Sequence, residues 1–137
     1  VCLFDMDRLF QFPSEMQLYQ RAKKKYAAKR YAGRVMFVEI NPCTGFWFLL
    51  HFLPNVVFRR YENYKQLLPE LQKYMPGYEK NKRYFIRTNL YKYLTENGDL
   101  ERAMSNSEKL CQLCKESPEG LNAFSEIHKV VELLINI

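Results

Sequence analysis

Apolar runs alternate with charged, polar stretches along this chain, and each run predicts one element. The short run Val1–Phe4 can form a strand, and Arg34–Ile40 is rich in the β-branched and aromatic residues typical of strands. The longest run, Phe46–Leu53, follows the turn-forming residues Asn41–Gly45. Because this run is apolar on both faces, we expect it to return beside Arg34–Ile40 as the second strand of a buried hairpin.

Polar segments with apolar residues at helical spacing predict helices in the rest of the chain. Ser14 precedes one, with Gln17 three residues later in a capping-box pattern, and this helix should run to about Arg30. Arg83–Asn89 reads as a third strand, although a helix over Phe85–Leu94 is the alternative. The remaining helices are expected over residues 61–74, 99–114 and 119–135.

Length and composition fit a single α/β domain over residues 1–137. The chain has 137 residues, of which 47% are hydrophobic and 15% aromatic, and this suits a packed core. The Phe46–Leu53 run is far shorter than the roughly 20 apolar residues that a spanning helix needs, and His51 interrupts it. We therefore expect no membrane-embedded segment.

The net charge of +6 is concentrated in one segment. Residues 21–34 contain seven basic residues and no acid, so the rest of the chain is close to neutral. Such a basic patch can bind a polyanion such as nucleic acid, with Tyr26 and Tyr31 available to stack on bases. The plainer interpretation is a solvated helix face. The residues of the patch are Arg21, Lys23, Lys24, Lys25, Lys29, Arg30 and Arg34.

Two acids directly follow the first predicted strand. Asp5 and Asp7 invite comparison with haloacid-dehalogenase phosphatases, which place a nucleophilic Asp and an acid Asp after a buried strand. In this chain Arg8 and Leu9 replace the small residue and the Thr or Val that usually follow the pair. A pair of surface acids is the alternative interpretation.

The cysteines and histidines do not predict a metal site. Cys111 and Cys114 have CxxC spacing, but no second pair supplies two further zinc ligands, so we expect no metal and no cofactor. Four cysteines permit disulfides in three pairings. His128 lies on the apolar face of the last helix and is expected to be a packed residue, whereas His51 lies in the predicted return strand.

One block of sequence resembles the deoxyribonuclease II family. The matching residues are Val35–Asn41, then Gly45-Phe46-Trp47, then His51 followed by Phe-Leu-Pro-Asn. A weaker likeness covers Ser117–Phe124 and Lys129. The resemblance implies a phospholipase-D-like sheet flanked by helices, present as a single lobe. It also implies secretion, disulfides and metal-independent cleavage of DNA by two His-X-Lys motifs.

The resemblance also implies that catalysis has been lost. Tyr31-Ala32-Gly33 stands where the first His-X-Lys motif would lie, and His51 matches an auxiliary histidine that remains from the site. We therefore expect a secreted pseudoenzyme that binds nucleic acid through the basic patch, or that binds a host or self protein partner. The chain begins with Val1, so we also expect a processed or excised product.

Two other function classes stay open at this point. The first is an enzyme, either a phosphohydrolase that uses Asp5 and Asp7 or an acid nuclease that forms a homodimer to rebuild a site around His51. The second is a protein-interaction module whose tyrosine-rich segment 61–93 binds a partner.

Overall fold

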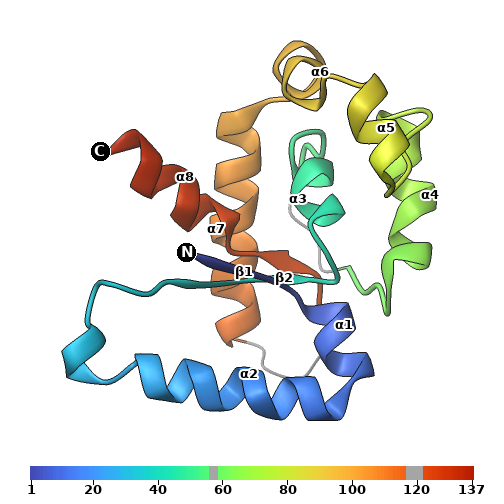
Figure 1. Ribbon diagram of the computed structural model, residues 1–137. Coiled ribbons are helices and arrows are strands. Elements are labelled where there is room, and N and C mark those ends of the chain that lie inside the picture. The colour runs from blue at the N-terminus through green and yellow to red at the C-terminus, as the bar shows by residue number, and fades with distance from the viewer. Residues whose placement is uncertain (56–58, 117–121) are drawn as a thin grey trace.

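A three-stranded sheet forms the centre of the computed structural model, which describes residues 1–55, 59–116 and 122–137 (Figure 1). The strands are β1 (Cys2–Asp5), β2 (Phe37–Asn41) and β3 (Phe124–Ser125), in the order β1-β2-β3. β1 is parallel to β2, with Asp5 opposite Ile40, and β3 is antiparallel to β2. The two strands predicted as Val1–Phe4 and Arg34–Ile40 are therefore confirmed; the first is shifted by one residue, and the second begins three residues later and ends one later.

Helices make up most of the remaining described residues, and the chain is a mixed α/β domain. Figure 1 shows α1 and α2 below the strands and α3 above them. The helices are α1 (Met6–Gln11), α2 (Pro13–Tyr26), a 3-10 turn (Lys29–Tyr31), α3 (Gly45–Leu50), α4 (Tyr64–Tyr74), α5 (Lys82–Arg87), α6 (Leu90–Asn97), α7 (Leu100–Glu116) and α8 (Ile127–Ile135).

The predicted hairpin is wrong, because the apolar run after the turn is the helix α3. Leu49 and Leu50 are fully buried, and α3 contacts α4, α7 and β2. A helix covered on nearly all sides has apolar residues all round, and in a short segment this pattern equals that of a buried strand. Gly45 lets α4 approach closely, since a Cβ there would lie 3.3 Å from the side chains of Leu67 and Leu71.

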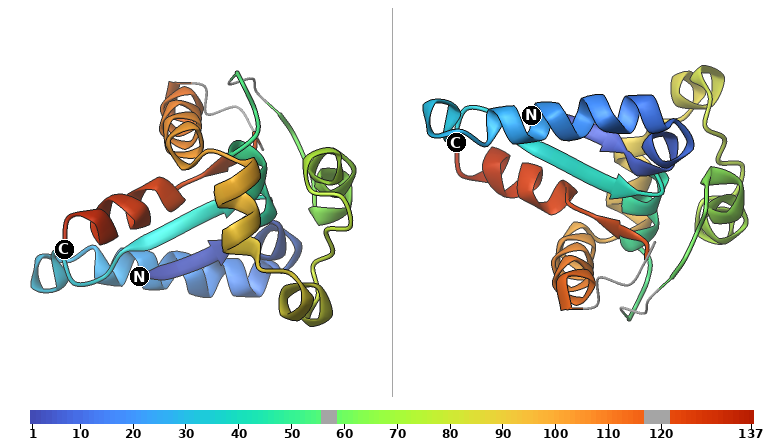
Figure 2. Two further views of the ribbon diagram at one scale, coloured as in Figure 1. Left: turned by 90° about the horizontal axis from the view of Figure 1, so that it is seen from above. Right: turned by 90° about the horizontal axis from the view of Figure 1, so that it is seen from below.

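The α3 helix is held from its carboxyl end as well as by packing. The side-chain amide of Asn106 on α7 donates to the carbonyl oxygens of Leu50 and Leu53, at 3.1 and 2.9 Å. These carbonyls belong to the end of a helix and the loop after it, where backbone acceptors lack helical partners. Figure 2 shows α4 and α5 beyond α3, away from the strands. The core therefore centres on α3 rather than on a hairpin.

The predicted strand at 83–89 is also wrong. Asn81 caps α5 by accepting a hydrogen bond from the Tyr84 amide at 2.8 Å, and Asn89 caps α6 by accepting from Lys92 at 3.0 Å. Each asparagine thus begins a short helix inside a segment whose composition favours a strand. The alternative helix over Phe85–Leu94 comes closer to the observed structure.

The other helix predictions are largely confirmed. The helix over 61–74 is α4, which continues through Pro69, and that over 99–114 is α7. α2 ends at Tyr26, short of the predicted end, and its first residue is Pro13, so Ser14 does not cap it. The last helix is α8; the start predicted for it, residue 119, lies outside the described residues.

Shortening Leu49 tests whether the core centres on α3. We expect Leu49→Ala to lower the free energy of unfolding by about 3 kcal/mol, because the cavity left in a fully buried site is not filled. Ile86→Ala is the control, since Ile86 is 73% exposed and its loss should cost less than about 0.5 kcal/mol. Urea denaturation followed by circular dichroism measures both. Equal effects of the two substitutions would contradict the buried position of α3.

Candidate functional site

Polar side chains from three distant parts of the chain meet at the carboxyl end of β1. We call this group of Asp5, Asp7, Thr44 and Lys80 the acid–lysine cluster. Asp5 is the last residue of β1, Asp7 lies in the first turn of α1, Thr44 precedes α3, and Lys80 lies between α4 and α5. Ligands of α/β proteins commonly bind at the carboxyl ends of parallel strands.

The carboxylate of Asp5 is the centre of this cluster. Its Oδ1 accepts two hydrogen bonds from Thr44, one from the backbone amide and one from the hydroxyl, each at 3.0 Å. Its Oδ2 forms an ion pair with the Lys80 Nζ at 3.3 Å. The Asp5 side chain keeps 29% of its surface exposed, so the carboxylate is held in place and still open to solvent.

Asp7 and Lys80 complete the electrostatics of the cluster. Partial burial raises the pKa of Asp7, and the negative charge of Asp5 adds to this effect. Burial lowers the pKa of Lys80, but Cys43, Asp5 and Asp7 together raise it above its usual value. Lys80 is therefore a cation at neutral pH, and Asp7 takes up a proton more readily than an aspartate in water.

A pocket opens beside these groups. It has a volume of about 630 Å³, and its walls include Asp5, Asp7, Arg8, Glu62 and Lys80. Three carboxylates and two cations therefore face one cavity. In the part of the chain that the structure describes, no group of three or more His, Cys, Asp or Glu side chains could hold a metal ion. A cation at this site would thus depend on the two aspartates together with ligand oxygens.

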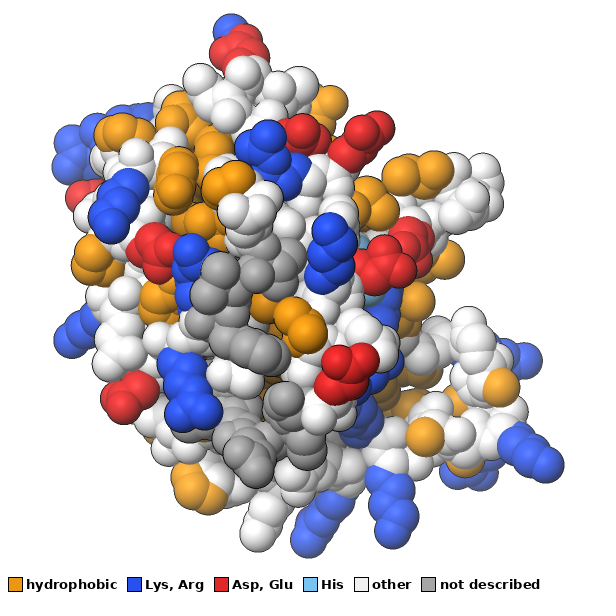
Figure 3. All heavy atoms as spheres, turned by 180° about the vertical axis from the view of Figure 1, so that it is seen from behind, with side chains coloured by type: hydrophobic (Ala, Val, Ile, Leu, Met, Phe, Trp, Pro, Cys, Tyr) orange, Lys and Arg blue, Asp and Glu red, His pale blue; other side chains and the backbone are white. Residues whose placement is uncertain are grey.

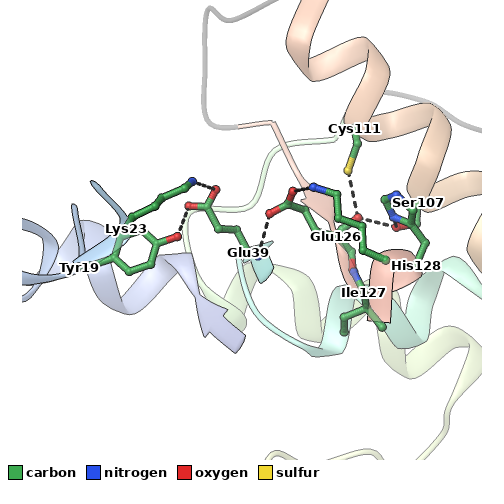
Figure 4. Close-up of polar contacts among 10 residues, drawn as sticks. Tyr19, Lys23, Glu39, Ser107, Cys111, Glu126, Ile127 and His128 are labelled. Atoms are coloured by element: carbon green, nitrogen blue, oxygen red, sulfur yellow. Dashed lines mark hydrogen bonds and ion pairs between the residues drawn. The ribbon is translucent and has the colours of Figure 1, made fainter. Parts of the chain in front are cut away.

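The basic patch lies on the second half of α2, on the 3-10 turn that follows it, and at Arg34 just beyond that turn. All seven of its basic residues are exposed. Lys23 is tied into the fold, because its Nζ contacts the Glu39 carboxylate at 3.2 Å, next to the hydroxyl of Tyr19 (Figure 4). No described acid forms an ion pair with the other six. In the upper part of the face drawn in Figure 3, basic side chains lie among acidic and hydrophobic ones.

The two tyrosines of the patch are only partly available for stacking. The rings of Tyr26 and Tyr31 contact each other with centroids 4.9 Å apart. Lys25 lies over the first ring at 5.3 Å, and Arg30 lies over the second at 4.8 Å. Because both residues are half-buried, a base could reach only their outer edges.

His51 lies at the end of α3 and not on a strand. It is 4% exposed, and its Nδ1 is 3.0 Å from the carbonyl oxygen of Trp47. A carbonyl can only accept, so Nδ1 carries the proton in this contact. Burial lowers the pKa of the imidazole, and His51 is therefore neutral at pH 7. His51 is not among the residues lining the acid–lysine pocket, so the structure does not join the two candidate sites.

The remaining histidine and the cysteines have structural roles. His128 Nδ1 is 2.7 Å from the Ser107 hydroxyl, which in turn donates to the Ser125 carbonyl (Figure 4). His128 is thus a packed residue, as predicted. The Cys111 thiol donates to the same carbonyl at 3.2 Å, and burial raises its pKa to about 12.

All four cysteines are free, so the expectation of disulfides is wrong. Cys2 lies on β1, Cys43 is buried beside α3, and Cys111 and Cys114 lie one turn apart on α7. Partial burial also raises the pKa of Cys114, so neither thiol of the CxxC pair is activated.

The chain belongs to the RloB-like protein family, whose model matches residues 1–134. No curated protein and no solved structure matches it. The expected membership in the deoxyribonuclease II family is therefore wrong. The block that suggested it, Gly45-Phe46-Trp47 with His51, is the start and the carboxyl cap of the buried helix α3. Part of the weaker likeness, residues 117–121, lies outside the described residues.

Expectations that rested on that resemblance lose their support. The phospholipase-D-like sheet required Phe46–Leu53 to be a strand, and it is α3. Secretion had no other basis and stays an untested prediction. No helix in the described ranges is long and apolar enough to cross a membrane.

Sequence reasoning found Asp5 and Asp7 but missed their partners. Thr44 was hidden in a segment interpreted as a hairpin turn, and Lys80 lies 75 residues from Asp5 in a polar stretch without a motif. Turn residues that follow a parallel strand were the signal that could have pointed to Thr44.

The buried position of His51 predicts a pH dependence of stability. Its pKa is lower in the folded state than in the unfolded chain, so its contribution is complete above about pH 6.5 and is lost as the pH falls through the folded pKa. We expect His51→Gln to reduce the loss of stability between pH 8 and pH 5. Urea denaturation of both proteins at the two pH values measures the difference. An identical loss in the two proteins would contradict the burial of His51.

Proposed function

We propose that this member of the RloB-like protein family binds a divalent cation and hydrolyses phosphoesters at the acid–lysine cluster. One observation carries the proposal: two aspartates and a lysine meet in a pocket at the carboxyl end of the parallel pair β1–β2. Asp5 is the last residue of β1, Asp7 lies in α1, and the lysine comes from a distant loop.

The composition of the cluster favours a hard cation such as Mg²⁺. This ion prefers oxygen ligands, and it is usually held by one or two carboxylates together with waters and substrate phosphates. Asp5 and Asp7 would provide the carboxylates. Thr44 fixes one oxygen of Asp5 and leaves Oδ2, which forms an ion pair with Lys80, for a cation. Bound Mg²⁺ would polarise the phosphoryl group and favour ionisation of an attacking water.

The two basic side chains of the pocket suit a phosphate ligand. Lys80 and Arg8 line the pocket together with the aspartates, and Lys80 is protonated at neutral pH. Arg8 forms a two-bond ion pair with Glu15 at 2.9 and 3.0 Å, which fixes its guanidinium beside the pocket. In hydrolysis, water oxygen would bond to phosphorus, the bond from phosphorus to the ester oxygen would break, and that oxygen would take up a proton. Lys80, a cation in the same pocket, would stabilise the negative charge that develops on this oxygen before solvent protonates it.

The basic patch favours nucleic acid as the phosphoester. Six of its cations have no acid partner among the described residues, and a polynucleotide would gain free energy by replacing the counterions of such a surface. Binding of nucleic acid by the patch does not depend on catalysis at the acid–lysine cluster, because a protein without hydrolytic activity could still bind through the patch.

Substitution of the aspartates tests the metal site. We expect Asp5→Asn and Asp7→Asn each to weaken Mg²⁺ binding at least about tenfold, since each removes one charge and one ionic ligand. Both variants should abolish Mg²⁺-dependent hydrolysis of bis(p-nitrophenyl) phosphate. Isothermal titration calorimetry measures Mg²⁺ binding. Absorbance at about 405 nm, where nitrophenolate absorbs, measures hydrolysis.

Glu101→Gln is the matched control, because Glu101 is an exposed acid on α7 outside the pocket. It should bind Mg²⁺ and hydrolyse the ester as the parent protein does. Two results would contradict the proposal: hydrolysis that continues in the presence of a chelator, or Mg²⁺ affinity that is unchanged by Asp5→Asn and by Asp7→Asn.

The salt dependence of binding tests the patch. We expect the triple variant Lys24→Glu, Lys25→Glu, Lys29→Glu to lose affinity for a DNA duplex of random sequence and to show a smaller slope of log K against log salt. Fluorescence anisotropy between 50 and 300 mM salt, about the range where counterion release dominates, measures the slope. A control triple variant with the same charge change, at exposed Lys65, Lys73 and Lys109, should retain more affinity. Equal losses in both variants would show that net charge, rather than the patch, binds DNA.

A further inference from the structure

A second pocket of about 530 Å³ lies at the carboxyl end of α3, where α6, the start of α7 and α8 meet it. None of its lining residues belongs to the acid–lysine pocket. Trp47 and His51 come from α3, Tyr91 comes from α6, and Asp99 comes from the turn before α7. Figure 1 shows α6 lying across the end of α7, close to α3.

The shape of this pocket depends on a close approach at Gly98. A Cβ at this position would lie 2.8 Å from the Cβ of His51 and 2.9 Å from the Leu94 carbonyl oxygen. The Asp99 amide donates to the His51 carbonyl oxygen at 3.1 Å. The turn between α6 and α7 is therefore fixed against the end of α3, so backbone contacts hold the pocket in this shape.

The charge of the pocket is negative. Among the described residues that line it, Asp99 is the only charged one, because His51 is neutral and the others are uncharged. One oxygen of Asp99 accepts from the Arg102 amide at 3.1 Å, and Asp99 has no ion pair with a described residue. His51 Nδ1 is engaged with Trp47, so the unprotonated Nε2 is an acceptor. The pocket thus offers hydrogen-bond acceptors and a carboxylate that has no ion pair with a described residue.

Aromatic and aliphatic side chains supply the rest of the lining. Trp47 is 8% exposed and contacts His51 edge to face, whereas Tyr91 is 81% exposed. Leu94 and Val131 add an apolar wall. Aromatic faces attract cations, and the attraction increases when water is excluded. Aromatic walls beside an unpaired carboxylate are suited to an organic cation with an apolar stem.

We propose that this pocket binds a guanidinium or alkylammonium group, with the charge beside Asp99 and the stem against Trp47 and Tyr91. The group could belong to a free amine or to an arginine or lysine side chain of a protein, since both present the same chemistry. This site is separate from the proposed phosphoester chemistry.

Fluorescence of Trp47 tests the proposal directly, because it is the only tryptophan in the sequence. We expect n-butylguanidinium to change the emission saturably, and the neutral butyramide to have no such effect. A capped pentapeptide with one central arginine separates the two sources. Binding tighter than that of butylguanidinium indicates a protein partner, and weaker binding indicates a free amine; either supports the site. Amide shifts of Thr95 and Gly98 in ¹⁵N spectra are the second readout, should the emission not respond.

Two variants and one control test whether the charge of Asp99 and the ring of Tyr91 are needed to bind butylguanidinium. Asp99→Asn removes the charge while keeping a side chain that can cap α7, and it should weaken butylguanidinium binding at least about fivefold. Tyr91→Ala, at an exposed position, should weaken it about threefold. Glu96→Gln is the matched control on α6 and should have no effect.

Absence of a saturable response in both readouts up to 50 mM ligand, about the limit of meaningful affinity for so small a group, would overturn the proposal. Equal binding of butyramide, or unchanged binding by Asp99→Asn, would also overturn it.

Discussion

The carboxylate of Asp5 is the contact on which the arrangement around the sheet depends. It receives two hydrogen bonds from Thr44 and an ion pair from Lys80, so one side chain joins β1, the turn before α3 and the loop before α5. The Asp7 amide adds a bond of 3.0 Å to the Pro42 carbonyl oxygen in the same turn. Because the turn is fixed here, α3 begins at a defined point and enters the core above the sheet. A charged group that organises its neighbours in this way, yet stays open to solvent, is suited to bind a ligand.

A second set of polar contacts joins the two ends of the chain across β2. Glu39 accepts from the Tyr19 hydroxyl at 2.7 Å, and its own amide donates to Glu126 at 2.9 Å (Figure 4). Burial and this carboxylate raise the pKa of Tyr19, so the phenol remains a donor. Lys23 belongs to this network, which separates it from the other cations of the basic patch. The patch is therefore a surface of six available charges on α2 and the turns that follow it, and α2 is anchored at its inner face.

Local patterns in the sequence predicted some elements well and others poorly, for physical reasons. The strand at β2 and the helix α7 have clear periodicity, and both were predicted. The segment Phe46–Leu53 was not, because burial on all sides removes the contrast between faces that separates a helix from a strand. Asp5 and Asp7 were found because they follow a strand directly. Thr44 and Lys80 approach them through tertiary packing, which no local pattern encodes. The likeness of the Trp47–His51 block to another family reflected shared composition in a buried segment rather than a shared site.

Mn²⁺ in place of Mg²⁺ provides the most direct test of the cation site, because its unpaired electrons broaden nearby NMR signals. In ¹⁵N spectra with substoichiometric Mn²⁺, we expect selective loss of the amide signals of Asp5, Asp7 and Thr44. The amides of Gly98 and Asp99, at the other pocket, should remain sharp. Broadening confined to other acidic surfaces, or no selective broadening at all, would contradict a metal site at the acid–lysine cluster.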